Sequence, residues 1–220
     1  MDVNITGKPS FGYVNADLEP GEFIMAESDA MASMHGDVDM HAKLNGNPVS
    51  ALLKKTLGRE SLFINKFSNN TQETKCVTFS KQTPGDVVSL DLNNESFCLQ
   101  PGAYIASTSG VKLGLKWAGL SSFIGREGLF KLVVKGTGTV CFGAYGGIIE
   151  RKLEDECVVD TSHLVGYEPN ISLHMQLAGG AISSLFGGEG LVTRLEGTGK
   201  YYIQTRSVNG LGKWLNTKID

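Results

Sequence analysis

Two histidines and two aspartates alternate at every second position in a pattern suited to binding a metal ion: His35, Asp37, Asp39 and His41. Alternate residues of a β-strand share one face, so a single strand over residues 34–42 places all four side chains together. The opposite, buried face would then consist of Met34, Val38 and Met40. Imidazole and carboxylate groups bind zinc, manganese or iron. Neighbouring side chains on that face lie about 7 Å apart, so at most two could hold one ion. The other interpretation is a solvated polar face of an ordinary half-buried strand.

A second polar group includes Asp160, Ser162 and His163, residue types that form nucleophile–base pairs. Catalytic groups of this kind normally converge from separate elements, whereas these three are nearly contiguous. By strand alternation, Asp160 and Ser162 face away from His163. The sequence therefore favours a local role, in which Asp160 and Thr161 cap a turn and His163 bonds between subdomains.

The segment Gly197-Thr198-Gly199-Lys200 resembles a phosphate-binding loop only in part. The full motif requires Ser or Thr after the lysine, and Tyr201 occupies that position. The sequence also lacks the Gly-x-Ser-x-Gly elbow of a hydrolase. We therefore predict no catalytic residues and no cofactor.

The elements that would position these residues are β-strands. Apolar and polar residues alternate over 30–36, 111–117 and 171–177, and further strands are predicted at 129–135, 139–144, 191–195 and 201–206. The Gly-Thr-Gly segments at 136–138 and 197–199 fall between two such runs and predict hairpin turns. The one helix predicted is short and covers residues 49–57.

Composition limits the classes of function. The formal net charge is −3, from 20 Lys and Arg against 23 Asp and Glu, which argues against a dedicated nucleic-acid-binding protein. No apolar run reaches the length of a membrane span, and the N-terminus has no leader pattern. The four cysteines are widely spaced in apolar strand patterns. These features predict a cytoplasmic protein with reduced thiols.

A threefold repeat organises the chain. A glycine–glutamate turn before an apolar strand occurs at 57–63, 124–130 and 186–192. The spacing of a second repeated motif, at 18–24 and 99–105, indicates an insert over roughly 37–50 in the first unit. We predict one compact unit, 1–220, that consists of repeats at 10–92, 93–152 and 153–220.

Four motifs carry a family resemblance: Pro-Gly-Ala-Tyr-Ile-Ala (101–106), Gly-Ala-Tyr-Gly-Gly (143–147), Val-Asp-Thr-Ser-His-Leu-Val (159–165) and Gly-Thr-Gly-Lys-Tyr-Tyr-Ile-Gln-Thr-Arg-Ser (197–207). Together they resemble the mitochondrial biogenesis family named for altered inheritance of mitochondria. The resemblance implies an all-β chain of three sandwich-like subdomains similar to the tryptophan-RNA-binding attenuation protein. It also implies a homotrimer that forms a pseudo-nine-fold ring. Ser162 departs from the family's usual glycine, which would reshape the turn before His163.

The sequence thus predicts a non-enzymatic oligomeric scaffold or binding protein. The alternative is a small-molecule or metal-binding protein, with a pocket between subdomains or at the trimer axis. Apolar pairs at 123–124 and 185–186 precede two of the glycine turns. Such patches join protomers or contact a partner protein or a membrane surface.

Overall fold

The computed structural model describes residues 1–44, 63–100, 102–117, 130–177 and 191–219. Antiparallel strands form nearly all of the regular structure in these ranges, in three sheets. The helix predicted at 49–57 and most of each glycine–glutamate turn lie outside the described residues, as do the apolar pairs at 123–124 and 185–186.

A four-stranded sheet forms one side of the molecule, in the order β1-β2-β7-β4. Its strands are β1 (Asp2–Thr6), β2 (Tyr13–Leu18), β4 (Met31–Met34) and β7 (Lys75–Ser80). Burial alternates strictly along β2, where Val14, Ala16 and Leu18 point inward. One face of this sheet therefore covers a core, and the other lies open.

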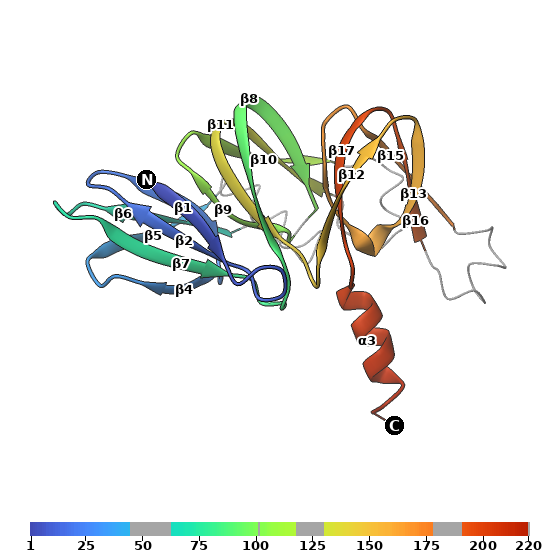
Figure 1. The fold of residues 1–220 in the computed structure, drawn as a ribbon, viewed down its shortest axis with the longest axis horizontal. Helices are drawn as coiled ribbons and strands as arrows, with labels where there is room; N and C mark the ends of the chain where they lie inside the picture. Colours follow the sequence, from blue (N-terminus) through green and yellow to red (C-terminus); the bar gives the residue numbers. More distant parts are fainter. Residues whose placement is uncertain (45–62, 101, 118–129, 178–190, 220) are drawn as a thin grey trace.

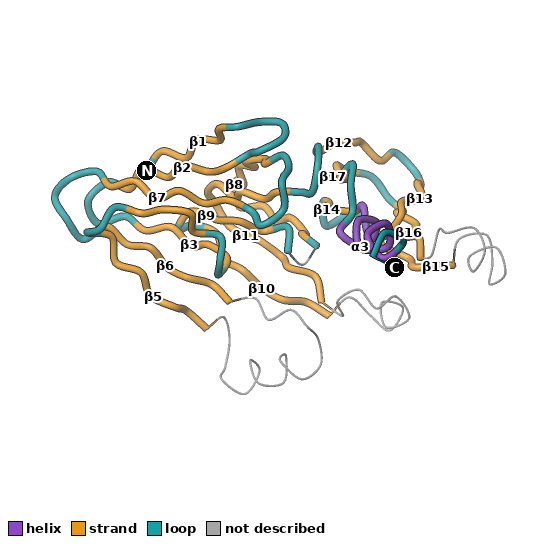
Figure 2. The backbone as a smooth tube through the Cα atoms, turned by 90° about the horizontal axis from the view of Figure 1, so that it is seen from below, coloured by secondary structure: helices purple, strands orange, loops and turns teal. Residues whose placement is uncertain are grey.

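A ten-stranded sheet runs the length of the molecule, in the order β12-β17-β14-β8-β11-β9-β3-β6-β5, with β10 paired to β11. Figure 2 shows β3, β6 and β5 side by side toward one end and β12, β17 and β14 at the other. The strands are β3 (Phe23–Glu27), β5 (Val38–Leu44), β6 (Phe63–Asn69), β8 (Val87–Leu99), β9 (Tyr104–Thr108), β10 (Val111–Trp117), β11 (Phe130–Gly143), β12 (Ile148–Leu153), β14 (Leu164–Tyr167) and β17 (Gly199–Gln204).

The third sheet has the order β13-β16-β15 and comprises β13 (Glu156–Asp160), β15 (Ser172–Leu177) and β16 (Leu191–Glu196). A single 3₁₀ turn, η2 (Thr161–His163), joins β13 to β14. The helix α3 (Val208–Asn216) follows β17 and is capped by Ser207, whose side chain accepts a hydrogen bond from the backbone N–H of Gly210.

Aromatic packing joins the middle and the C-terminal parts of the chain. The rings of Phe97 and Phe142 stack with centroids 5.8 Å apart, and Tyr202 meets Phe142 edge-on at 5.2 Å. A second cluster under the four-stranded sheet is centred on Phe67 and Phe79, whose rings meet edge-on at 5.1 Å. Such pairs add to the stabilisation that apolar burial already provides.

The structure confirms the β class and most of the predicted strands, including 111–117 as β10. It contradicts the hairpin prediction at 136–138, because β11 continues through those residues with a shift of register. Residues 197–198 likewise connect two strands of different sheets and are not a hairpin turn. The sequence analysis missed the helix α3, which carries Trp214 at 58% exposure.

Candidate functional site

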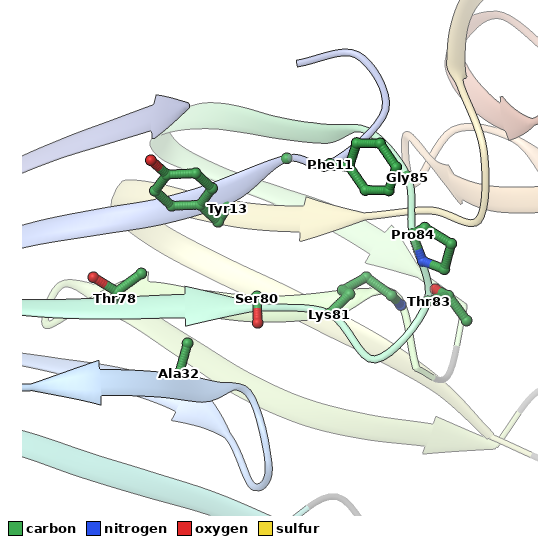
Figure 3. Close-up of a pocket in the computed structure, with 10 residues that line it drawn as sticks. Phe11, Tyr13, Ala32, Thr78, Ser80, Lys81, Thr83, Pro84 and Gly85 are labelled. Carbon is green, nitrogen blue, oxygen red and sulfur yellow. The ribbon is translucent and has the colours of Figure 1, made fainter. Parts of the chain in front are cut away.

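A largely apolar hollow of about 370 Å³ lies on the open face of the four-stranded sheet. Figure 3 shows Thr78 and Ser80 of β7 between Tyr13 of β2 and Ala32 of β4. The segment after β7 closes one end. The full lining is Phe11, Gly12, Tyr13, Ala32, Thr78, Ser80, Lys81, Thr83, Pro84 and Gly85.

Binding chemistry in this hollow is apolar with a few hydroxyl groups. Phe11 is 72% exposed at its rim. The cation of Lys81 donates to the backbone oxygen of Gly102, and the Thr78 hydroxyl donates to Asn15 at 2.9 Å. The lining contains no histidine, carboxylate or thiol, and its polar side chains are hydroxyl groups and the Lys81 ammonium.

A second hollow of about 370 Å³ lies between β8, β17 and the turn before β15. It is more polar than the first, with the carboxylates Glu95 and Glu168 and the cation of Lys200 among its lining residues. Lys200 forms an ion pair with Glu150 at 3.0 Å. The hydroxyl of Tyr202, which also lines the hollow, donates to the same carboxylate at 2.7 Å.

These contacts shift the ionisation of the groups concerned. The Tyr202 hydrogen bond, followed by the Lys200 contact, lowers the pKa of Glu150 below its ordinary 4.5. The bond to Glu150 raises the pKa of Lys200, whereas burial is the main cause of the raised pKa of Tyr202. At neutral pH this group is a carboxylate, an ammonium and a neutral phenol, which bind polar ligands better than they transfer protons.

The predicted metal-binding face does not form, because residues 34–42 are not one strand. β4 ends at Met34 and β5 begins at Val38, whose N–H donates to the carbonyl of His35 across a tight turn at 3.0 Å. Within β5, Val38 is buried as expected, but Met40, which follows it on the same face of the strand, is 46% exposed. The predictions of one polar face shared by four residues and of a buried Met40 are therefore wrong.

Of the four predicted ligands, the structure brings only His35 and Asp37 together, with Nδ1 and Oδ2 3.6 Å apart. Asp37 also lies 3.6 Å from the ammonium of Lys75. Asp39 accepts a hydrogen bond from Asn70 at 2.6 Å, and His41 is exposed on β5 opposite Lys66. No group of three or more potential metal ligands occurs among the described residues.

Asp160 and Ser162 act locally. Asp160 caps η2 by accepting from the backbone N–H of Ser162 at 2.8 Å and from its hydroxyl at 2.7 Å. Because that hydroxyl bonds to the carboxylate, it is not paired with His163 as a nucleophile would be with its base. Ser162 thus lies in a 3₁₀ turn, whereas Gly21 and Gly102, in the motifs at 18–24 and 99–105, adopt positive φ.

His163 joins the turn to β17. Its Nδ1 lies 2.6 Å from the backbone oxygen of Gln204. In return, the side chain of Gln204 donates to the carbonyl of Ser162 at 2.8 Å. This reciprocal pair fixes the end of β17 against η2, which is a structural role.

Comparison with known proteins places this architecture in a family. Residues 3–206 match the family described as Mitochondrial biogenesis AIM24. The chain belongs to that family. A curated relative is the uncharacterized protein M6_Spy0233 of Streptococcus pyogenes serotype M6, which is 27% identical over 93% of this chain and 86% of its own. The crystal structure of protein SPYM3_0169 from Streptococcus pyogenes is similar with a TM-score of 0.81, at 25% identity and 99% coverage of both chains.

The AIM24 family match brings no activity with it. The relative is itself uncharacterised, and neither comparison indicates an enzymatic reaction or a specific role. The described part of the AIM24-family chain also has no helix long and apolar enough to cross a membrane.

Sequence reasoning missed two features of this AIM24-family chain. The Glu150, Lys200 and Tyr202 group joins strands β12 and β17, and no local pattern announces a pairing of segments about 50 residues apart. The helix α3 did have a signal, since Ser207 precedes apolar residues at positions 208, 211 and 215. Gly210 and Gly212 obscured it, because glycine is unfavourable inside a helix.

Proposed function

We propose that this chain is the non-enzymatic subunit of an oligomeric scaffold or binding protein, built as three similar units. The proposed assembly is a homotrimer with nine units in a ring, similar to the fold of the tryptophan-RNA-binding attenuation protein. The observation that carries the proposal is that strand pairs about 60 residues apart in the sequence have matching partners, together with open strand edges in the described sheets. A linear array of units gains stability when its terminal faces are covered.

Equivalent strand pairs support the repeat. Leu99 at the end of β8 lies opposite Leu132 on β11. In the pair of β13 and β16, Val159 lies opposite Thr193. Val159 follows Leu99 by 60 residues, and Thr193 follows Leu132 by 61 residues. This match supports a second and a third unit of similar build.

Equivalent turns extend the repeat to the first unit. The N–H of Ala30 donates to Glu27 at 3.2 Å after β3, and the N–H of Ile171 donates to Glu168 at 3.0 Å after β14. Gly21 and Gly102 have φ of 82° and 77°. The next residue in each case, Glu22 or Ala103, donates its N–H to the carbonyl oxygen three residues before it.

Open edges support assembly. Within the described residues, β5 and β12 end the ten-stranded sheet, and β13 ends the three-stranded sheet. Met40 on β5 is 46% exposed and Val158 on β13 is 51% exposed. Unpaired edges with apolar side chains are sites of strand pairing and aggregation unless they are covered. A head-to-tail contact between unlike ends of identical chains closes into a ring when the rotation from one chain to the next divides a full turn.

Light scattering of the full chain at micromolar concentration tests the assembly. We expect a mass about three times 23.6 kDa, and a clean monomer would overturn the proposal. The double variant Met40→Lys, Val158→Lys should lower the mass, because a charge at an edge blocks strand pairing. The matched control Phe11→Lys introduces the same charge at an exposed apolar residue away from the edges and should keep the trimer.

The second candidate function is binding of a small molecule or a metal. The second hollow favours it, because Glu168 and Lys200 come from the third unit while Glu95 comes from β8. A ligand screen should then raise the melting temperature, and Glu168→Gln should remove that increase. Elemental analysis tests the metal alternative at His35 and Asp37. If the screen finds no ligand and the protein holds no stoichiometric metal, the second candidate function is excluded and only the scaffold function remains.

We further propose a reducing compartment such as the cytoplasm. Cys141 is a buried free thiol, and burial raises its pKa to about 12. A neutral buried thiol packs as a small apolar group. The acidic net charge of −3 supports a partner other than nucleic acid.

A further inference from the structure

The helix α3 leaves an apolar surface uncovered. Figure 1 shows the helix extending away from the sheets at the end of the chain, and none of its residues is buried. Positions 208, 211 and 215 share one helical face, and position 214 adjoins it. The exposed apolar residues of this segment are Val208, Leu211, Trp214, Leu215 and Ile219. A surface of this kind marks an interaction site.

The helix needs a partner for its own stability. It has nine residues, and isolated helices shorter than about 12–15 residues are marginal in water. Gly210 and Gly212 weaken it further, since glycine is among the poorest helix formers. The Ser207 side chain accepts a hydrogen bond from the N–H of Gly210 at the start of the helix. A binding surface that covers the apolar face would therefore stabilise the helix.

The charge of this segment contrasts with that of the rest of the chain. Residues 206–220 contain three of the 20 cationic residues and one of the 23 anionic residues, which leaves 17 against 22 in the other 205. The net charges are thus +2 and −5. Among the described residues, Arg206, Lys213 and Lys218 form no ion pair with a carboxylate. The segment thus combines an apolar helix face with three cations that have no carboxylate partner, and this combination suits a surface of anionic groups over an apolar interior.

We propose that α3 binds the interface of an anionic lipid bilayer. Its apolar face enters the headgroup region, with Trp214 at the boundary where tryptophan is enriched. Lys213 and Lys218 contact lipid phosphates, and Arg206 joins them from the last residue before the cap. The segment that matches the family model ends at residue 206, so α3 lies outside that match. The three cations of the segment are what favours an anionic surface as its occupant.

The proposed ring would strengthen this contact, and this step alone depends on the proposed trimer. A rotation axis places all three copies of α3 on the same side of a cyclic ring. Three helices facing one plane bind a vesicle with an avidity well above that of one helix. A monomer would still bind, with lower affinity.

Co-sedimentation of the full chain with vesicles tests the proposal. We expect binding to mixed phosphatidylcholine and phosphatidylglycerol vesicles, and little binding to phosphatidylcholine alone. Raising the salt from about 0.1 M to about 1 M should reduce it, because the screening length falls from about 10 Å to about 3 Å. Lys213→Gln combined with Lys218→Gln should weaken partitioning about tenfold or more. The control pair, Lys112→Gln with Lys152→Gln, removes two other exposed lysines and should leave it unchanged.

The apolar face has its own variants. Trp214→Ser combined with Leu211→Ser should abolish binding, whereas Trp214→Phe should retain most of it. Because α3 has no buried residue, these changes should leave the melting temperature of the body unchanged.

Three results would overturn the proposal: no binding to anionic vesicles, equal loss in the control pair, or a lower oligomeric mass in the Trp214 and Leu211 variant. The last result would mean that α3 packs on another copy of the chain. Vesicle binding by a monomeric protein would instead overturn the ring and leave the anchor intact.

Discussion

Two stretches of the chain, 130–143 and 191–204, contain the same Gly-Thr-Gly corner and yet form different backbones. The first is the single strand β11 of 14 residues. The second is divided into β16 and β17, six residues each, which belong to different sheets.

The corners themselves are nearly identical. Gly136 and Gly138 have φ of 137° and 141°, and Gly197 and Gly199 have φ of 121° and 147°. A Cβ on Gly136 would lie 2.2 Å from the carbonyl oxygen of Gly110, and one on Gly197 would lie 2.5 Å from that of Asn170. Local chemistry therefore permits the same bend in both places.

The partner strands differ. β8 is continuous over 13 residues and stays paired with β11 on both sides of the corner, with only a shift of register at Gly136 and Thr137. The corresponding partners of the other stretch are β12 and β13, which residues 154–155 separate. Glycine therefore allows a bend, whereas the neighbouring strand decides whether the hydrogen-bonded strand pairing continues through that bend.

The largest expected effect comes from filling the corners. Gly136→Ala and Gly197→Ala should each lower the free energy of unfolding by about 3 kcal/mol, through positive φ and a clash with backbone oxygen. Urea denaturation measures the loss. The control Gly36→Ala has nothing within 4 Å and should change stability by less than about 0.5 kcal/mol. A neutral Gly197→Ala beside a damaging Gly136→Ala would show that the corners are not equivalent.

The ends of the two stretches offer a smaller difference. Gly143 ends β11 with a backbone bond, its N–H donating to Ala103 at 2.8 Å, whereas β17 ends with the His163 contact to Gln204 at 2.6 Å. His163→Ala should therefore cost about 1 kcal/mol in thermal or urea unfolding. His174→Ala is the control, because His174 is an exposed histidine whose contact with Glu196 spans 3.5 Å. Equal effects at the two histidines would contradict the assignment.

A cross-strand pair gives a pH-dependent difference. Glu150 on β12 lies opposite Tyr202 on β17. At the corresponding position of the other stretch, Ser89 on β8 lies opposite Cys141 on β11. The folded pKa of Glu150 is lowered, so its stabilisation is present above its ordinary 4.5 and is lost as the pH falls through the folded value. Since the side chain is 50% exposed, Glu150→Gln should cost less than about 1 kcal/mol at pH 7.

Unfolding curves at several pH values measure this contribution. The gap between wild type and Glu150→Gln should close below pH 4.5. Ser89→Ala should produce a difference that does not depend on pH. A gap that widens in acid would reverse the sign of the argument.

The smallest expected effect is at the turn that lacks glycine. Ser162→Gly removes the hydroxyl bond to Asp160 and loosens the unfolded chain, so it should lower stability by about 0.5–1 kcal/mol. A calorimetric melting temperature measures it. An increase in stability would mean that the glycine turn seen at Gly21 and Gly102 also suits the third position.

The alternation of apolar and polar residues was enough to predict one strand without the structure. Residues 111–117 alternate strictly, and β10 covers the same seven residues. The prediction of one strand over 34–42 used the same kind of pattern and was wrong. The turn after Met34 has few local signals, and it interrupts the alternation between His35 and Asp39. A tight turn of that sort depends on what the strands on each side pair with, here β7 for β4 and β6 for β5.

The sequence alone determined the strand periods, the glycine positions, the acidic charge and the family resemblance, because each depends on residue order and type. The tertiary structure decided which segments pair: that β8 spans the corner of β11, that β12 brings Glu150 to Tyr202, and that α3 has no cover. These outcomes involve residues far apart in the chain. Their pairing depends on the sum of burial and hydrogen bonding over whole sheets, which no local window contains.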